Sequence, residues 1–288
     1  MIEVLELRGS AAAKAGSNRA ASVLETGGLV LFPDMAFPLA DDERPLIDPA
    51  ILNGKSKNVS LDPATGRVKG VQVDDAANAA LGRMLSRFAD YAEELLGELS
   101  PRYAGALQRR RTSFRPGAVA TRALSPRKDD RRLHTDAFPS NPVQGRRILR
   151  VFANINPTGE ERVWELGEDN FQTLAERYRD RIGAAPRSAW LMERLGLTKG
   201  RQSGYDQAML RLHDAAKLDE TYQRTAPKRR MAFPAGCMWV VYTDSVLHAA
   251  LAGQHALEQT FLMPFEAMET PALSPVRVLE QVGGRPLL

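Results

Sequence analysis

Three features are scarce in this 288-residue chain, and each absence excludes a class of protein. The single cysteine, Cys237, cannot form an internal disulfide, which excludes a disulfide-rich secreted domain and leaves a core residue. The longest unbroken apolar run covers only residues 237–242, far short of the roughly 18 residues that a membrane-spanning helix needs. The first residues lack the basic and apolar regions of a signal peptide. We therefore expect a cytoplasmic protein.

Several catalytic and binding motifs are missing as well. Gly54-Lys55-Ser56 lacks the earlier glycine of a phosphate-binding loop, so an NTPase is excluded. The chain has no His-Glu-x-x-His motif and no pair of cysteines, which disfavours a zinc hydrolase. Aromatic residues make up only 7%, and no strip of interleaved aromatic and basic residues is present. Nucleic acid is therefore not the partner that we expect.

Hydrophobic residues, in contrast, make up 43% of the chain, enough to bury a substantial core. The chain has 39 Lys+Arg against 35 Asp+Glu, a net charge of +4. The arginines are concentrated in one segment, as Arg109, Arg110, Arg111, Arg115, Arg122, Arg127, Arg131, Arg132, Arg146, Arg147 and Arg150. Each one alone fits a solvated basic surface, but together they indicate an anionic ligand.

Hydrophobic periodicity predicts a mainly β protein with helices. Apolar residues at three- and four-residue steps predict helices over 20–24, 76–99, 171–182, 189–197 and 205–222. Strands are expected over 29–32, 147–156, 230–233, 237–242, 246–251 and 257–263. Strands on both sides of a helical insertion fit a double-stranded β-helix, a cupin-like jelly roll with helices packed outside. No linker or repeat divides the chain, so we expect one domain over 1–288.

The four histidines allow a metal hypothesis to be tested by elimination. His134 and Asp136 are two residues apart, so in a strand they project from the same face and supply two ligands of a 2-His-1-carboxylate triad. The third ligand should come from a distant strand, and His248 lies in one. We expect His255 at a solvated turn, and His213 on a helix from which it has no obvious way to complete a metal site built on strands. His248 remains the preferred third ligand, with a core histidine as the alternative.

Two imidazoles and one carboxylate leave coordination positions open, which suits Fe(II) and oxygen activation, although manganese and cobalt bind the same ligands. 2-Oxoglutarate is the natural electron source for such a centre. Its distal carboxylate needs a cation, and segment 257–261 after His248 offers no arginine. The strand that follows the His-x-Asp pair offers Arg150, our first choice, and Arg147.

With these residues in place, the chain resembles the family of 3-deoxy-D-manno-oct-2-ulosonic acid (Kdo) hydroxylases. These are Fe(II)- and 2-oxoglutarate-dependent oxygenases that hydroxylate C3 of a Kdo sugar in the inner core of bacterial lipopolysaccharide. The resemblance rests on the segments HTDAFPS (134–140), RILRVFANINP (147–157), RVW (162–164), HAALAG (248–253) and LEQTF (257–261). It covers roughly residues 110–265, whereas residues 1–75 carry no matched motif and their role stays open.

The resemblance implies a role for each site residue. His134, Asp136 and His248 would be the iron ligands, and Arg150, Arg147 and Thr260 the residues that bind 2-oxoglutarate. Arg115 and Arg162 would contact the carboxylate of the sugar, and Trp164 would stack on its ring, unless Trp164 is a core aromatic. The implied cofactors are Fe(II), 2-oxoglutarate and O2.

The implied substrate is a Kdo-containing glycolipid, Kdo-lipid A, which adds a peripheral contact with the cytoplasmic face of the inner membrane to the expected location. Two alternatives stay open. One is a 2-oxoglutarate oxygenase that acts on a nucleic acid or a protein. The other is a jelly-roll sugar-binding module without catalytic activity, in which the histidines are structural.

Overall fold

The computed structural model describes residues 1–9, 17–119, 125–182 and 200–288. Its strands are β1 (Val4–Glu6), β2 (Leu29–Phe32), β3 (Val59–Leu61), β4 (Val68–Lys69), β5 (Gln108–Arg115), β6 (Arg147–Asn154), β7 (Arg162–Gly167), β8 (Lys228–Phe233), β9 (Met238–Tyr242), β10 (His248–Ala252) and β11 (Ala256–Met263). Its α-helices are α2 (Ser17–Glu25), α3 (Asp75–Leu99), α4 (Phe171–Arg177), α6 (Gly204–Leu218), α7 (Glu220–Thr225) and α8 (Pro275–Gly283). Short 3-10 helices are η1 (Arg44–Leu46), η2 (Pro49–Ile51), η4 (Pro126–Lys128), η5 (Arg179–Arg181), η6 (Phe265–Ala267) and η7 (Pro271–Leu273).

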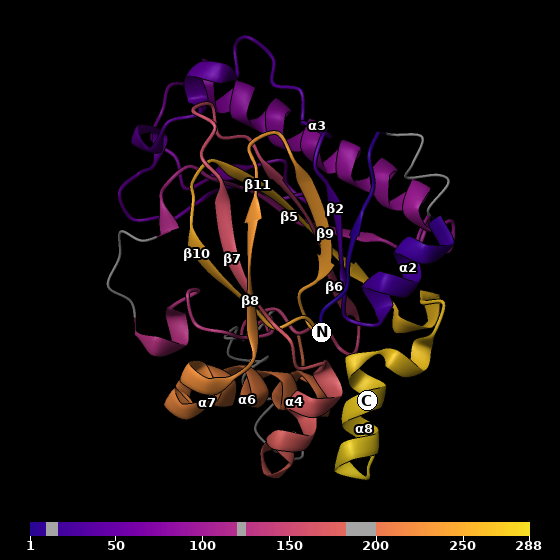
Figure 1. Ribbon diagram of the computed structural model, residues 1–288. Coiled ribbons are helices and arrows are strands. Elements are labelled where there is room, and N and C mark those ends of the chain that lie inside the picture. The colour runs from indigo at the N-terminus through magenta and orange to yellow at the C-terminus, as the bar shows by residue number, and fades with distance from the viewer. Residues whose placement is uncertain (10–16, 120–124, 183–199) are drawn as a thin grey trace.

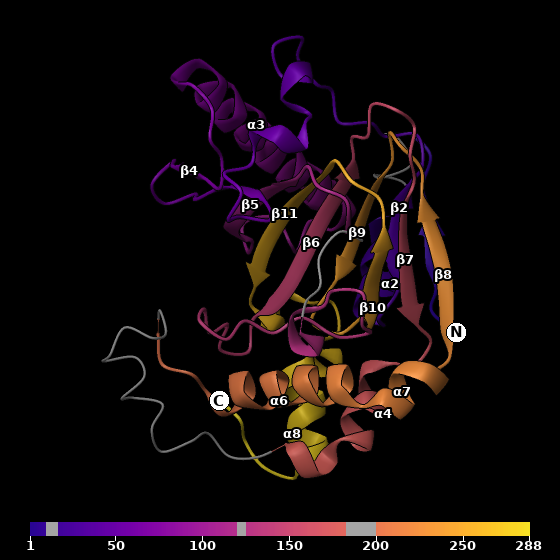
Figure 2. The ribbon, with the colours of Figure 1, turned by 90° about the vertical axis from the view of Figure 1, so that its left-hand side faces the viewer.

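The strands form two sheets. The large sheet has eight strands in the order β1-β2-β9-β6-β11-β5-β3-β4, and the small sheet has three in the order β10-β7-β8. Neighbouring strands are antiparallel, except that β1 and β2 are parallel. Figure 1 shows α4, α6, α7 and α8 gathered at one end of the sheets, and Figure 2 shows β10, β7 and β8 as a separate layer. The predicted mainly β, cupin-like architecture with packing helices is confirmed.

The alternation of side chains along β6 separates two cores. Leu149 and Val151 belong to the larger core, which includes the buried faces of α2 and α3. Phe152 points to the other side, into a smaller core between the two sheets, where it stacks on Trp239 with ring centroids 5.1 Å apart. Each sheet therefore forms one wall of the space between the sheets. Polar side chains of β6 on the same face as Phe152 point into this space.

Most predicted elements are present, and the differences have local causes. The helix expected over 205–222 is divided, because Asp219 ends α6 with extended backbone and its side chain accepts from the Tyr222 amide to begin α7. His134 and Asp136 were expected in a strand, but His134 makes only an isolated bridge to His248. The expected helix over 189–197 and Arg122 lie outside the described residues. Among the described residues, no helix has the length and apolar character to cross a membrane.

A buried ion pair fixes the turn between β9 and β10. Arg147 and Asp244 are both fully buried, and the guanidinium donates to both carboxylate oxygens at 2.9 and 3.0 Å. Arg147 also donates to Ser245 Oγ at 2.9 Å and lies over the Tyr242 ring at 3.8 Å. Residues 147 and 150 are three apart in one strand, so their side chains point to opposite faces. Arg147 is therefore held away from the space between the sheets, which contradicts its expected role in binding 2-oxoglutarate.

Replacing Arg147 with methionine should destabilise the protein strongly, because Asp244 would stay buried without its counter-charge. Loss of one partner of a buried pair costs about 3–5 kcal/mol, and we expect that loss in the free energy of unfolding measured with urea. Arg83→Met is the control, since Arg83 and Asp42 form a pair 2.7 Å long with both side chains more than half exposed. The control should lose less than about 1 kcal/mol. Equal losses in the two variants would contradict the anchoring role.

Candidate metal centre and active-site cavity

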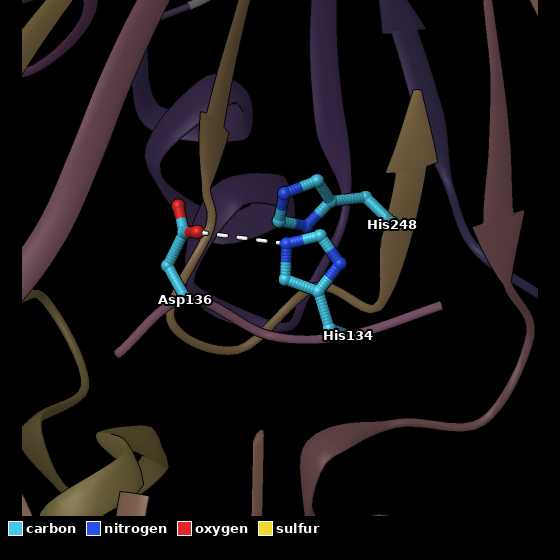
Figure 3. A group of neighbouring side chains, drawn as sticks. All are labelled: His134, Asp136 and His248. Atoms are coloured by element: carbon cyan, nitrogen blue, oxygen red, sulfur yellow. Dashed lines mark ion pairs between the residues drawn. The ribbon is translucent and has the colours of Figure 1, made fainter. Parts of the chain in front are cut away.

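The structure brings His134, Asp136 and His248 together, as Figure 3 shows. The backbones of His134 and His248 exchange two hydrogen bonds of 3.1 and 2.9 Å, and the Asp136 amide donates to the Thr243 carbonyl at 2.7 Å. One ligand atom from each of the three side chains lies within 4.8 Å of the others. Within the ranges that the structure describes, no other group of His, Cys, Asp and Glu side chains meets this criterion. Main-chain hydrogen bonds thus place all three side chains.

The two imidazoles are oriented for metal binding by the backbone. His134 Nδ1 lies 2.7 Å from the Arg132 carbonyl oxygen, and His248 Nδ1 lies 2.9 Å from that of Val246. A carbonyl accepts, so each Nδ1 carries the proton and each Nε2 presents a lone pair. A backbone carbonyl on the far ring nitrogen is the usual arrangement of a metal-ligating histidine. The donor set therefore fits a divalent transition metal.

The protonation states also suit a metal. Burial lowers the pKa of His134 well below its usual value and lowers the pKa of His248, so both rings are neutral near pH 7. Burial alone would raise the pKa of Asp136, but the Arg150 guanidinium and the two imidazoles hold it well below its usual range. Two neutral nitrogens and one anionic oxygen need to lose no proton before they bind a cation.

The three side chains lie at the edge of a cavity of about 330 Å³ between the sheets. The large sheet contributes Arg115, Arg150, Phe152 and Glu258, the small sheet contributes Arg162, Trp164 and Ala250, and α6 contributes His213 and Lys217. Two of these residues were not predicted to lie here. Lys217 is buried and its ammonium donates to the Arg127 carbonyl at 3.3 Å. His213 lies edge-on to His134, with ring centroids 5.4 Å apart. His213 therefore lines the cavity, although it is not one of the three clustered ligand candidates.

A chain of charged groups crosses the large-sheet wall of the cavity. Arg150 Nη2 lies 3.1 Å from Asp136 Oδ2, and its Nη1 lies 3.2 Å from Glu258 Oε1. Arg115 donates twice to the other Glu258 oxygen, at 2.8 and 2.6 Å. Thr260 pairs directly with Arg150 across β6 and β11, and its hydroxyl lies 3.4 Å from Glu258. Sequence reasoning missed Glu258, although its two-residue spacing from Thr260 puts both side chains on one face.

Arg162 differs from Arg115 and Arg150 because it is buried but makes no ion pair among the described residues. Its side chain lies in the cavity wall, and its Nε and Nη1 have no hydrogen-bond partner among the described residues. Burial, and then the charge of Arg115, lower the pKa of Arg162 to about 10, which leaves it charged near pH 7. A buried cation without an ion pair is unfavourable, so Arg162 is a candidate residue for binding an anionic ligand.

Of the two remaining histidine and aromatic candidates, His255 lies differently from expectation, and Trp164 lies where one of its two expected roles would place it. His255 is at a turn with φ of +54°, but it is 6% exposed rather than solvated, and it stacks on Phe114. Trp164 is 2% exposed and stacks on His248 with ring centroids 5.3 Å apart. Trp164 also packs edge-on against Phe152, so it supports the orientation of a metal-ligand candidate. The ring face against His248 is not free to stack on a sugar, and Trp164 is a core aromatic.

The cluster should bind a divalent transition metal, and its histidines should be required. We expect anaerobic titration with Co(II) to give a visible absorption band in the wild type and none in His248→Ala, because one of three ligands is removed. His255→Ala is the matched control, since His255 is also buried but lies outside the cluster. Circular dichroism should show that both variants are folded. A band of unchanged intensity in folded His248→Ala would contradict the assignment.

Comparisons with known proteins agree with this geometry. The family model of 3-deoxy-D-manno-oct-2-ulosonic acid (Kdo) hydroxylase matches residues 8–286, well beyond the motif-bearing span of 110–265. A crystal structure of the Kdo hydroxylase KdoO, a non-heme Fe(II) alpha-ketoglutarate-dependent dioxygenase, in complex with cobalt(II) has a TM-score of 0.94 and 39% identity, and the match covers 99% of this chain and 97% of that one.

Two further KdoO structures match over the same shares of both chains, 99% and 97%. The complex with alpha-ketoglutarate and Fe(III) has a TM-score of 0.93 and 38% identity. The complex with succinate and Fe(III) has a TM-score of 0.92 and 39% identity. A comparison with curated proteins finds no match. The family match across nearly the whole sequence confirms the resemblance drawn from the motifs: this chain belongs to the Kdo hydroxylase family.

Proposed function

We propose that this protein is an Fe(II)- and 2-oxoglutarate-dependent dioxygenase that hydroxylates C3 of a Kdo sugar in Kdo-lipid A. The observation that carries the proposal is the His134, Asp136 and His248 cluster at the edge of a cationic cavity. Family membership and the KdoO complexes with alpha-ketoglutarate, succinate and Fe(III) support it. No described feature favours a nucleic-acid or protein substrate, or a binding module without activity.

His134 Nε2, His248 Nε2 and a carboxylate oxygen of Asp136 would hold Fe(II). Bound together with 2-oxoglutarate and O2, Fe(II) would supply an oxidant strong enough for an unactivated C–H bond, and 2-oxoglutarate would be converted to succinate and CO2. The residues of this chain bind and orient. The carbonyls of Arg132 and Val246 fix the two rings, and the packing of Trp164 on His248 keeps that ring in place.

Arg150 and Thr260 are the residues that we propose for the distal carboxylate of 2-oxoglutarate. Both project from the large sheet toward the space between the sheets, on directly paired positions of β6 and β11. The guanidinium of Arg150 is buried and already aligned by Asp136 and Glu258, and its Nε has no hydrogen-bond partner among the described residues. A carboxylate is the natural partner for that remaining donor.

Arg162, with Arg115 beside it, is the proposed contact for the carboxylate of the Kdo sugar. Glu258 already occupies Arg115 with two hydrogen bonds, whereas two nitrogens of Arg162 have no partner. Arg162 therefore has the greater capacity for a new anion. Because the proposed substrate is a lipid, we further propose that the protein works in the cytoplasm with a peripheral contact at the inner membrane surface.

The function is tested with purified protein, Fe(II), 2-oxoglutarate, O2 and Kdo-lipid A. We expect one succinate for each product that has gained one oxygen atom, with the new hydroxyl at C3 as located by nuclear magnetic resonance. Succinate formation should rise when the glycolipid is added and should be absent in His248→Ala. Hydroxylation at another carbon would contradict the proposed position. Succinate without any oxidised glycolipid would contradict the proposed substrate.

The role of Arg150 predicts a selective effect on the cosubstrate. Arg150→Ala should raise the apparent KM for 2-oxoglutarate by roughly 10- to 100-fold, which is the equivalent of one or two hydrogen bonds between charged groups. The apparent KM for the glycolipid should change far less. Saturating Fe(II) is needed, because Arg150 also contacts Asp136. Arg146→Ala is the control, since Arg146 donates to Val143 and Gln108 and is not in the cavity wall. An unchanged 2-oxoglutarate requirement would move the role to another residue.

A further inference from the structure

A second, smaller cavity of about 100 Å³ adjoins the one that holds the metal centre. Arg115, Asp130, Arg162 and Ala250 line both cavities, so the two meet at the arginines proposed to bind the sugar carboxylate. The outer wall comes from a different part of the chain, the loop with Lys57 and Asn58 that precedes β3. The outer cavity has room for roughly three water molecules, enough for one anionic group but not for a sugar ring.

The charges around the outer cavity do not balance. Arg131 donates to both oxygens of Asp129, at 2.8 and 2.9 Å, so that pair is self-contained. Arg115 is likewise paired with Glu258 at 2.6 Å. Across the described ranges, Lys57 makes no ion pair, and it is exposed at the outer wall.

Asp130 is the remaining acid, and the Lys217 ammonium lies 3.7 Å from it. Arg162 is the last of the four cations that line this cavity, and its Nε and Nη1 have no hydrogen-bond partner in the described part of the chain. Among the described residues, neither Arg162 at the inner end nor Lys57 at the outer end makes an ion pair. A cavity lined by two cations that make no ion pair is a place where an anion is stabilised.

The loop that carries Lys57 is held in place by its own backbone contacts. The Asn53 side chain accepts from the amides of Lys55 and Ser56 at 3.1 and 2.9 Å, and the Asn53 amide donates to the Gly70 carbonyl at 3.2 Å. Gly70 has φ of +90°, and a Cβ there would lie 2.2 Å from the Asn58 carbonyl oxygen. Only glycine permits this close approach. The loop is therefore a fixed wall of the outer cavity.

We propose that the outer cavity is a second anion subsite, in which Lys57, together with Arg162 that lines both cavities, binds a carboxylate or phosphate group of the substrate beyond the reacting sugar. This inference rests on the proposed function. It also gives the N-terminal residues, which carry no catalytic motif, a role in selecting the substrate. A glycolipid with an anionic group next to the reacting sugar is then preferred over an isolated sugar.

The test compares three soluble substrates: the methyl glycoside of Kdo, a disaccharide of two Kdo units, and Kdo linked to a phosphorylated glucosamine. For each protein we divide the KM for a substrate with a second anion by the KM for the methyl glycoside. Lys57→Glu should raise this ratio by about tenfold, because the glutamate repels the second anion that Lys57 attracts. Lys55→Glu is the matched control, since it makes the same charge change in the same loop but away from the cavity wall. Its ratio should stay unchanged.

The pattern of KM ratios identifies the ligand. A rise only with the disaccharide assigns the subsite to a carboxylate, and a rise only with the phosphorylated substrate assigns it to a phosphate; both outcomes support the proposal. Unchanged ratios in Lys57→Glu, or equal rises in Lys57→Glu and Lys55→Glu, would overturn the subsite while wild-type turnover remains. Absence of wild-type turnover with all three substrates and with Kdo-lipid A would instead overturn the proposed function, and the subsite with it.

Discussion

The buried pair of Arg147 and Asp244 is the contact on which the geometry of the site depends. It ties the beginning of β6 to the turn after β9, and the Asp244 carboxylate also accepts from the Ile148 amide at 3.1 Å. The next hydrogen bonds follow from that turn: the Thr243 carbonyl accepts from the Asp136 amide at 2.7 Å, and β10 begins at His248. One ion pair remote from the cavity therefore positions two of the three candidate metal ligands.

The two arginines of strand β6 have different roles, one in stability and one in ligand binding. Arg147 faces the helices and is fully engaged by a buried acid, whereas Arg150 faces the cavity and contacts Asp136 and Glu258. The three-residue spacing sends them to opposite faces of the same sheet. Stability and ligand binding are thus supplied by neighbouring residues of one strand. A change of register by one residue would exchange the two environments and disable both.

Local patterns predicted much of this structure, and long-range pairing accounts for the rest. The helix over 76–99 and the strand over 29–32 follow from periodicity, and the His134, Asp136 and His248 cluster followed from strand spacing and elimination among four histidines. Face alternation alone disfavours a shared site for Arg147 and Arg150. The sequence does not reveal which acid pairs with Arg147, because Asp244 lies 97 residues away. His213 reaches the cavity through the packing of α6, which helix periodicity does not specify.

The buried acids of the cavity explain two of its arginines, Arg150 and Arg115, but not Arg162. Asp136 and Glu258 are ionised although they are buried, and both need counter-charges. Arg150 contacts both acids and Arg115 contacts Glu258, so these two arginines are explained by the protein itself. Arg162 is not, because no acid pairs with it among the described residues and a buried unpaired cation destabilises the fold. The substrate carboxylate that we propose for Arg162 would supply the missing negative charge.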